Sequence, residues 1–542
     1  MEGTVTPPEA AADDEVRGWV EAHAATVAPL VKEAHLASWE AAIGGGEEAQ
    51  ERNARARAEV KALYADPEGA RRVRAWLEGG RVRDPLLRRQ LVLLDHEYTG
   101  SQLPRETIDD LVRRATELEH LFHTFRATVD GKSVSENEIH QLLRDEGDVA
   151  VRRAAWEASK EVGALAAEPL RELVRRRNAA ARSLGFENAY AMDLHLQELP
   201  EEKLFAVLDA FRDQTDAPFR RFREGIDRAL AARFGVSAED LRPWHWADPF
   251  AQEAPASAGT VDLDAFFAGS DPVKVSADFF RGIGLEVDAV LARSDLYERE
   301  GKDQHAFCLD VDREGDVRIL CNVRPNERWT HVMLHELGHA AYDTGIPRDL
   351  PFLLRSPAHT LSTEAIAMYM GRLTRDPAWL REVMGAGLDD AQVADIVEQQ
   401  RARMLISARW ILVMAYFERE LYRNPDRADL NGLWWELVER LQYIRRPEGR
   451  DAPDWASKIH LSLSPVYYHN YLLGELMASQ ISAHARSEVP EGRSIAGHRS
   501  VGDFLSEKIF APGASLDWNE LLVHATGEGL SPRYFVRDFV EA

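Results

Sequence analysis

The chain has 542 residues, 45% of them hydrophobic, so it can bury a large core and exceeds the usual size of one compact core. Its 66 basic and 91 acidic residues give a formal net charge of −25, which argues against nucleic acid as a partner. The segment Met1 to Val16 lacks the basic patch and apolar run of a secretory signal, and no apolar stretch is long enough to cross a bilayer. We therefore expect a cytoplasmic protein without a membrane partner; the sequence indicates no oligomeric state.

Most of the sequence has the periodicity of amphipathic helices, which predicts a mainly-α fold. Helical runs cover roughly Thr107 to Thr128, residues 150–184 with a stop at Gly185, and Glu201 to Phe234. No repeat of fixed period is present. We expect one domain over residues 1–542, built from two helical lobes that flank a deep central cleft.

Two segments break the helical pattern: a Pro- and Ala-rich stretch near Ala254 to Thr260, and the segment from His305 to Val323, which is the more informative. Apolar residues alternate on both sides of DREGD, which supplies a turn, so we expect a β-hairpin. An extended edge there can bind a peptide main chain by strand addition. The two cysteines, Cys308 and Cys321, lie in this segment; reduced thiols are the simpler interpretation, and a single bridge between them stays open.

The motif HELGH follows the expected hairpin, within THVMLHELGHAAY. His335 and His339 are four residues apart, so both imidazoles leave the same helical face, a geometry that suits a tetrahedral Zn²⁺. Asn326 is the expected N-cap and Gly345 the expected C′ residue of this helix. Glu336 follows the first histidine and is the expected general base, taking a proton from the attacking water and later delivering it to the leaving amine.

A catalytic zinc needs a third protein ligand and leaves a fourth position for water. Glu364 in LSTEAIAMYMGRL is well placed on the next amphipathic segment, although a solvated helix residue is the other interpretation of this glutamate. His331 is interpreted as a residue of the helix start or as support for the ligands, and His359 as a surface or capping histidine.

The sequence resembles the angiotensin-converting-enzyme family of peptidyl-dipeptidases and, more distantly, the thimet-oligopeptidase family. The resemblance runs from EAHLASWEAAIGG near the N-terminus to FLSEKIFAPGASLDWNELL. Both families combine HExxH with a downstream glutamate, and the segment Glu364 to Ala367 resembles the family's EAIG. The resemblance therefore implies Glu364 as the third zinc ligand.

Further family positions are matched outside the zinc motif, in HAFCLD, ADPFAQ and KIHLSLSPVYYHNY. The resemblance implies that His305 and Ala306 hold the substrate chain, and that His460 and Tyr471 stabilise the oxyanion. It also implies a site for the terminal carboxylate of the substrate, made by Gln252, Lys458 and Tyr468. Tyr467 is expected to be the core residue among the three tyrosines.

The chain also departs from the family pattern. Met368 stands where the family has an aspartate that orients a zinc histidine, so the support of the ligands must differ. One extra residue separates His460 from the tyrosines, and Asn470 replaces the chloride-binding arginine. Chloride activation of the usual kind is therefore not expected.

These observations predict a zinc metallopeptidase that hydrolyses short peptides and releases C-terminal dipeptides. The first alternative is an oligoendopeptidase that cleaves internal bonds. The alternative from another class is a catalytically dead helical peptide-binding protein, against which the intact HELGH argues.

Overall fold

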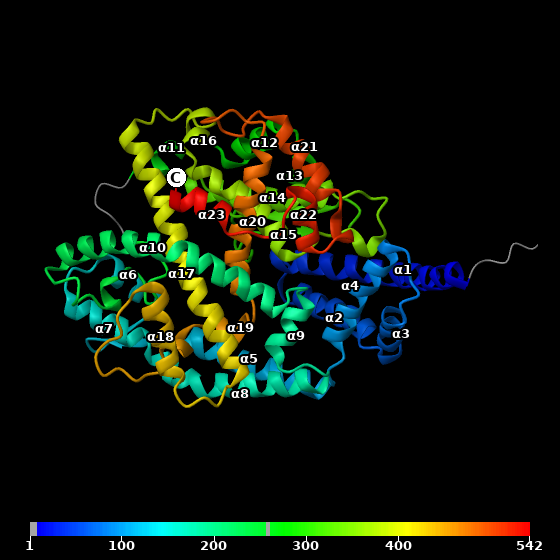
Figure 1. The fold of residues 1–542 in the computed structure, drawn as a ribbon, viewed down its shortest axis with the longest axis horizontal. Coiled ribbons are helices and arrows are strands. Elements are labelled where there is room, and N and C mark those ends of the chain that lie inside the picture. The colour runs from blue at the N-terminus through cyan, green and yellow to red at the C-terminus, as the bar shows by residue number, and fades with distance from the viewer. Residues whose placement is uncertain (1–7, 256–260, 542) are drawn as a thin grey trace, which may run out of the picture. The chain divides into compact units, whose positions relative to one another are not determined.

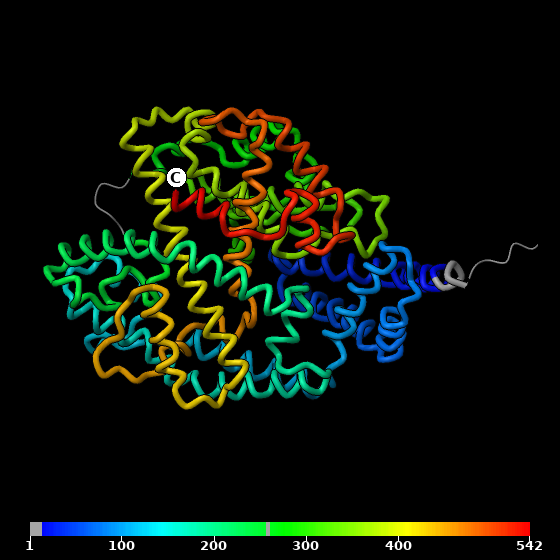
Figure 2. The backbone as a smooth tube through the Cα atoms, viewed as in Figure 1, coloured from blue at the N-terminus to red at the C-terminus, as the bar shows by residue number. Residues whose placement is uncertain are grey.

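A computed structural model describes residues 8–255 and 261–541, and it is mainly α-helical, as predicted. Residues 256–260, within the helix break expected near Ala254 to Thr260, lie outside this description, as do the first seven residues and the last. The element order can be followed in Figure 1, and the course of the backbone in Figure 2. None of the described helices is both long and apolar enough to cross a bilayer.

The chain divides into two compact units. Unit 1 comprises Met1–Gln102, Asp262–Asp390 and Gly474–Ser531, and unit 2 comprises Leu103–Val261, Ala391–Leu473 and Pro532–Ala542. The boundary at residue 473 falls within helix α20 (His469–Ala485).

Unit 1 contains the HELGH motif. Its elements in chain order are α1 (Pro8–Ala42), α2 (Gly46–Tyr64), α3 (Pro67–Glu78), α4 (Pro85–Ser101), α11 (Asp264–Phe267), α12 (Pro272–Gly282), α13 (Asp288–Leu291), β3 (Phe307–Asp310), β4 (Val317–Leu320), α14 (Glu327–Gly345), α15 (Thr360–Gly371), α16 (Pro377–Glu382), α21 (Arg499–Phe504) and α22 (Trp518–Thr526). Short turns of other helix types join them at Phe352–Leu354, Arg372–Arg375, Leu505–Phe510 and Gly513–Ser515.

An Asp-Pro pair starts several helices of unit 1. The aspartate accepts hydrogen bonds from the first free N–H groups of the helix, and the proline fits the first turn because no hydrogen bond is needed from its nitrogen. The pairs begin at Asp66, Asp84, Asp271 and Asp376. A core cluster between α1, α3 and α4 includes Val20, Val73 and Leu91.

Unit 2 contains α5 (Arg105–Thr124), β1 (Ala127–Val129), β2 (Lys132–Val134), α6 (Glu136–Asp145), α7 (Val149–Ser159), α8 (Glu161–Ser183), α9 (Ala189–Leu196), α10 (Glu201–Phe234), α17 (Asp390–Arg423, which begins at the boundary), α18 (Leu430–Gln442), α19 (His460–Leu463) and α23 (Arg533–Val536). Single turns lie at Pro243–His245, Asp454–Ser457 and Arg537–Glu541. Its core is aromatic: Phe417 on α17 packs against Trp434 at 5.1 Å and Trp455 at 5.4 Å between ring centroids.

The expected hairpin is present. β3 and β4 pair antiparallel with Phe307 opposite Leu320 and Asp310 opposite Val317, and both strands contact α14. Arg313 and Gly315 in the turn have positive φ values of 56° and 112°. The hairpin is therefore packed on the helix that carries HELGH.

The predicted helix ends were right in two places and wrong in two. Gly185 and Gly235 have φ values of 91° and 66° just beyond α8 and α10. The run predicted through Thr128 ends at Thr124, because Ala127–Val129 pairs with Lys132–Val134 as a second small hairpin. Gly345 is the last residue of α14 rather than a left-handed C′ residue, and a Cβ there would lie 2.7 Å from the Phe510 ring.

Candidate active site

Two helices position the predicted zinc ligands. α14 starts at Asn326, whose side chain accepts a hydrogen bond from the Trp329 N–H at 2.9 Å, as an N-cap residue does. α15 starts at His359, whose ring nitrogen accepts from the Leu361 N–H at 2.9 Å, so the expectation of a capping histidine is confirmed. α14 and α15 pack directly against each other.

Gly338, in the middle of HELGH, brings the two helices close. A Cβ at this residue would lie 3.0 Å from the Cα of Ala367 on α15 and 3.3 Å from its nitrogen. Few Cβ atoms approach a neighbouring backbone so closely, so glycine is the residue that fits here. The close approach places Glu364 opposite the two histidines.

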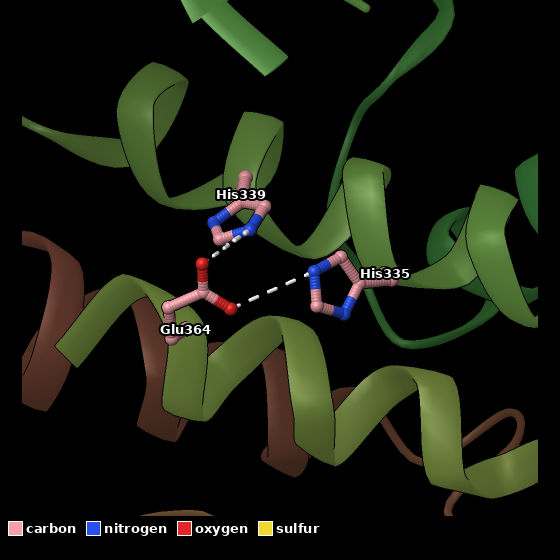
Figure 3. Close-up of side chains that lie close together, drawn as sticks. All are labelled: His335, His339 and Glu364. Atoms are coloured by element: carbon pink, nitrogen blue, oxygen red, sulfur yellow. Dashed lines mark ion pairs between the residues drawn. The ribbon is translucent and has the colours of Figure 1, made fainter. Parts of the chain in front are cut away.

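The three side chains converge, as Figure 3 shows. Nε2 of His335 lies 3.7 Å from Oε2 of Glu364, and Nε2 of His339 lies 4.0 Å from Oε1. The candidate ligand atoms all lie within 4.8 Å of one another. Within the described residues this is the one such group of three histidine, cysteine or acidic residues.

Each of the two imidazole rings also has a hydrogen-bond partner besides the Glu364 carboxylate. His339 Nδ1 lies 2.7 Å from the hydroxyl oxygen of Thr363, and the main-chain carbonyl of Ala367 accepts a hydrogen bond from the His335 ring. These contacts fix the ring orientations, a role that the family's aspartate has and Met368 cannot have. Sequence reasoning missed Thr363, although a hydroxyl residue beside the expected ligand was a usable signal.

Burial sets the charge states at this site. It lowers the pKa of His335 well below its ordinary value and that of His339 to about 4, so both rings are neutral at pH 7 with a lone pair available. Burial and, as the smaller cause, the nearby Glu364 carboxylate raise the pKa of Glu336 to about 8. Two neutral imidazoles and a carboxylate are the donor set of a catalytic zinc site, so these residues fit the ion.

The substrate-chain residues His305 and Ala306 directly precede β3. His305 is exposed and Ala306 partly exposed, and the second edge of β3 has no strand partner in the described part of the chain. The buried Lys302 anchors the preceding segment, because its ammonium donates to the carbonyl of Tyr297 at 2.8 Å and that of Asp295 at 3.0 Å. Lys302 was not singled out from the sequence.

In unit 2 the structure brings together the three residues expected at the substrate's terminal carboxylate. Lys458 Nζ donates to Gln252 Oε1 at 3.0 Å and lies 5.9 Å from the centre of the Tyr468 ring. Trp410 Nε1 donates to the Tyr468 hydroxyl oxygen at 2.6 Å. The side-chain oxygens of Gln252 and Tyr468 thus already accept hydrogen bonds. The ammonium of Lys458, the amide N–H groups of Gln252 and the hydroxyl of Tyr468 remain as donors for a ligand.

Burial lowers the pKa of Lys458 to about 8, so the ammonium is charged at pH 7. Lys458 and Tyr468 are each 8% exposed, and a charged hydrogen bond gains strength in such surroundings. Trp410 was missed at the sequence level, because a tryptophan on an apolar helix has the pattern of a core residue.

The residues expected at the oxyanion lie next to this cluster in unit 2. The His460 and Tyr468 ring centroids are 5.2 Å apart, and those of Tyr468 and Tyr471 are 5.3 Å apart. Burial lowers the pKa of His460 to about 4, so this ring is neutral at pH 7. Tyr471 is 38% exposed. Tyr468, and not Tyr467 as expected, is the buried tyrosine of the three.

Asn470 stands where the resemblance has a chloride-binding arginine. Its amide donates to Gln197 Oε1 at 2.9 Å, and Gln197 Nε2 donates to the Val466 carbonyl at 3.0 Å. Two neutral amides therefore hold the start of α20.

An HExxH helix with a glutamate from a second helix defines the gluzincin class of metallopeptidase folds. Residues 10–221 match the family model of angiotensin-converting enzyme, and residues 291–541 match that of peptidase family M3. An inactive angiotensin-converting enzyme-related protein of Caenorhabditis elegans is 19% identical over 440 residues, which cover 72% of this chain and 48% of that protein. The chain thus spans about half the length of this curated relative. These matches confirm that the chain is related to the angiotensin-converting-enzyme and M3 peptidase families.

Proposed function

We propose that the chain is a zinc-dependent peptidase that hydrolyses short peptides and releases C-terminal dipeptides. The observation that carries the proposal is the convergence of His335, His339 and Glu364, with Glu336 on the same helix as the two histidines. Zinc held by these three ligands would lower the pKa of its water to about 7 and polarise the scissile carbonyl.

Residues of this chain supply the proton transfers and the charge stabilisation. Glu336 accepts a proton from the attacking water and donates it to the leaving amine. His460 and Tyr471 donate hydrogen bonds to the oxygen that becomes negative in the tetrahedral intermediate. Removal of such a donor costs on the order of a hundredfold or more in rate.

The dipeptidase mode rests on the donor cluster of unit 2. An ammonium, an amide N–H and a phenol O–H suit the carboxylate at the end of a peptide. The edge of β3, after His305 and Ala306, supplies main-chain groups that can pair with the substrate by strand addition.

The proposed chemistry is tested with an internally quenched peptide, with and without a metal chelator, for the wild type and Glu336→Gln. We expect chelator-sensitive hydrolysis, restored by zinc, and its loss in Glu336→Gln while bound zinc stays near one ion per chain. Glu286→Gln, an exposed glutamate of the same unit, is the matched control and should keep full activity. Bound zinc without turnover of any peptide would instead favour a peptide-binding protein, as the inactive relative suggests.

A second candidate function is cleavage of internal bonds, which the resemblance to the thimet-oligopeptidase family favours; residues 291–541 match the model of peptidase family M3. Mass spectrometry of the products from a peptide with a free or an amidated C-terminus separates the two modes. Release of dipeptides from the free peptide and little cleavage of the amidated one supports the dipeptidase. Equal cleavage of both contradicts it.

A further inference from the structure

Unit 2 contains a pocket of about 360 Å³ that includes none of the residues assigned to peptide hydrolysis. It lies between α10, the segment after α10 and the end of α18. We call it the arginine pocket, because Arg220, Arg223, Arg242 and Arg445 line it together with Trp246 and Tyr443. These arginines outnumber its three acidic residues, in a chain whose net charge is −25.

Arg223 is the buried cation of the arginine pocket, at 4% exposure. Its guanidinium lies 4.4 Å from the centre of the Trp246 ring, and Nη2 lies 2.8 Å from Oδ1 of Asp227. Its Nε and Nη1 atoms are buried without a hydrogen-bond partner in the described residues. A buried guanidinium with five N–H donors and one carboxylate neighbour is incompletely compensated, which is costly unless a further acceptor is present.

Two other arginines of the arginine pocket, Arg220 and Arg445, are exposed. Arg220 contacts Asp216 at 3.4 Å and the Tyr443 hydroxyl at 3.1 Å, and Arg445 donates to the Glu239 carbonyl. Arg220 also stacks on the Tyr443 ring at 4.7 Å. Its ion pair with Asp216 is exposed, and surface ion pairs contribute little, so an anion can compete for this guanidinium. Arg242 differs, because Glu448 and two main-chain carbonyls already hold it.

One residue that lines the arginine pocket has a strained backbone conformation. Tyr443, directly after α18, has a φ of 57°, a left-handed conformation that bulky residues rarely adopt. Its hydroxyl donates to Asp216 Oδ1 at 2.5 Å, and its ring stacks on Phe219 at 5.9 Å. Strained backbone conformations of this kind collect at ligand sites.

We propose that the arginine pocket binds an oxyanion group, phosphate or carboxylate, of a small molecule, with Arg223 as the buried anchor and Arg220 and Arg445 as donors at the mouth. Guanidinium groups match both oxyanions in shape and charge. The bound anion supplies further negative charge beside Arg223, which has one carboxylate neighbour, Asp227. The proposal does not depend on peptidase activity, because no residue is shared.

The test uses the full chain and calorimetric titration with inorganic phosphate or acetate, at an ionic strength held constant with sodium chloride. We expect saturable binding of at least one anion. Arg220→Ala and Arg445→Ala should each weaken it about tenfold, because each removes one charge-assisted contact. Arg221→Ala, an exposed arginine of α10 outside the pocket, is the matched control and should bind as the wild type does.

Arg223→Lys keeps the charge but removes the planar group, and we expect it to abolish saturable binding. Because a substitution at the buried Arg223 can impair folding, the proposal is judged on the variants at the exposed Arg220 and Arg445. Preference for phosphate identifies a phosphorylated ligand and preference for acetate a carboxylate ligand. The proposal is overturned if neither anion binds saturably, or if both exposed variants bind like the wild type.

Discussion

The hydrogen bond between Thr363 and His339 offers a direct test of how the metal site is supported. Thr363→Val keeps the shape of the side chain and removes the hydroxyl that lies 2.7 Å from His339 Nδ1. The His339 side chain is 14% exposed, so water replaces the lost partner poorly. A buried polar group left without a partner costs about 1–3 kcal/mol, and loss of such support costs about 10–100-fold in metal affinity. We therefore expect a zinc dissociation constant raised by about 10–100-fold.

The assay is competition for zinc between the protein and a chromophoric chelator. Thr363→Ser restores the hydroxyl and should recover most of the affinity. Thr360→Val, an exposed threonine of the same helix, is the matched control and should not change it. An unchanged affinity in Thr363→Val, or an equal loss in Thr363→Ser, would refute the reasoning.

Three further predictions concern the buried lysines and the tryptophan of unit 2. Because the pKa of Lys458 is about 8, kcat/KM for free-carboxylate peptides should fall as the pH rises above about 8, where the lysine loses its charge. Amidated peptides should not show this fall. The same pH profile for both peptides would contradict the role of Lys458 in binding the terminal carboxylate. Trp410→Phe removes the donor to the Tyr468 hydroxyl and should raise KM for free-carboxylate peptides about 5–10-fold, with no change for amidated ones. Burial lowers the pKa of Lys160 from 10.5 to about 7, so between these values the unfolded chain binds more protons and the free energy of unfolding rises with pH. Lys160→Met should remove that rise, which is at most about 4 kcal/mol between pH 7 and pH 10 at 1.36 kcal/mol per pH unit, as measured by urea unfolding at the two pH values. An equal rise in both proteins would show that Lys160 is not its source.

The convergence of His335, His339 and Glu364 was the most predictable feature of the molecule. The spacing of His335 and His339 follows from helix geometry, so the sequence alone places both on one face. Glu364 lies on a second helix, so helix geometry alone could not assign it as a ligand, and the assignment came from the resemblance to the family. Trp410 was not predicted, because its hydrogen bond to Tyr468 depends on tertiary packing that no local pattern encodes. Thr363 was missed although its hydroxyl stands beside the expected ligand Glu364, which was a usable signal.

The misses in the fold have local causes. The hairpin at β1 and β2 was overlooked although Asp130-Gly131 is a strong turn signal, with φ values of 50° and 76° at the two residues. The helix predicted from Thr107 was instead extended into the first strand of this hairpin, to Thr128. At the end of α14, glycine was taken as a C′ residue, whereas Gly345 is required by the nearby Phe510 ring.

The close approach at Gly338 also bears on the choice of ion. Because main-chain atoms of α14 and α15 are nearly in contact, the separation of the histidines from Glu364 is set by the packed backbones and less by side-chain rotamers. A cage of this kind resists expansion. It accommodates a small tetrahedral cation such as Zn²⁺, and it disfavours Ca²⁺, which needs longer bonds and six to eight oxygen ligands. In the proposed zinc site, a residue without a side chain would thus contribute to metal selectivity without touching the metal.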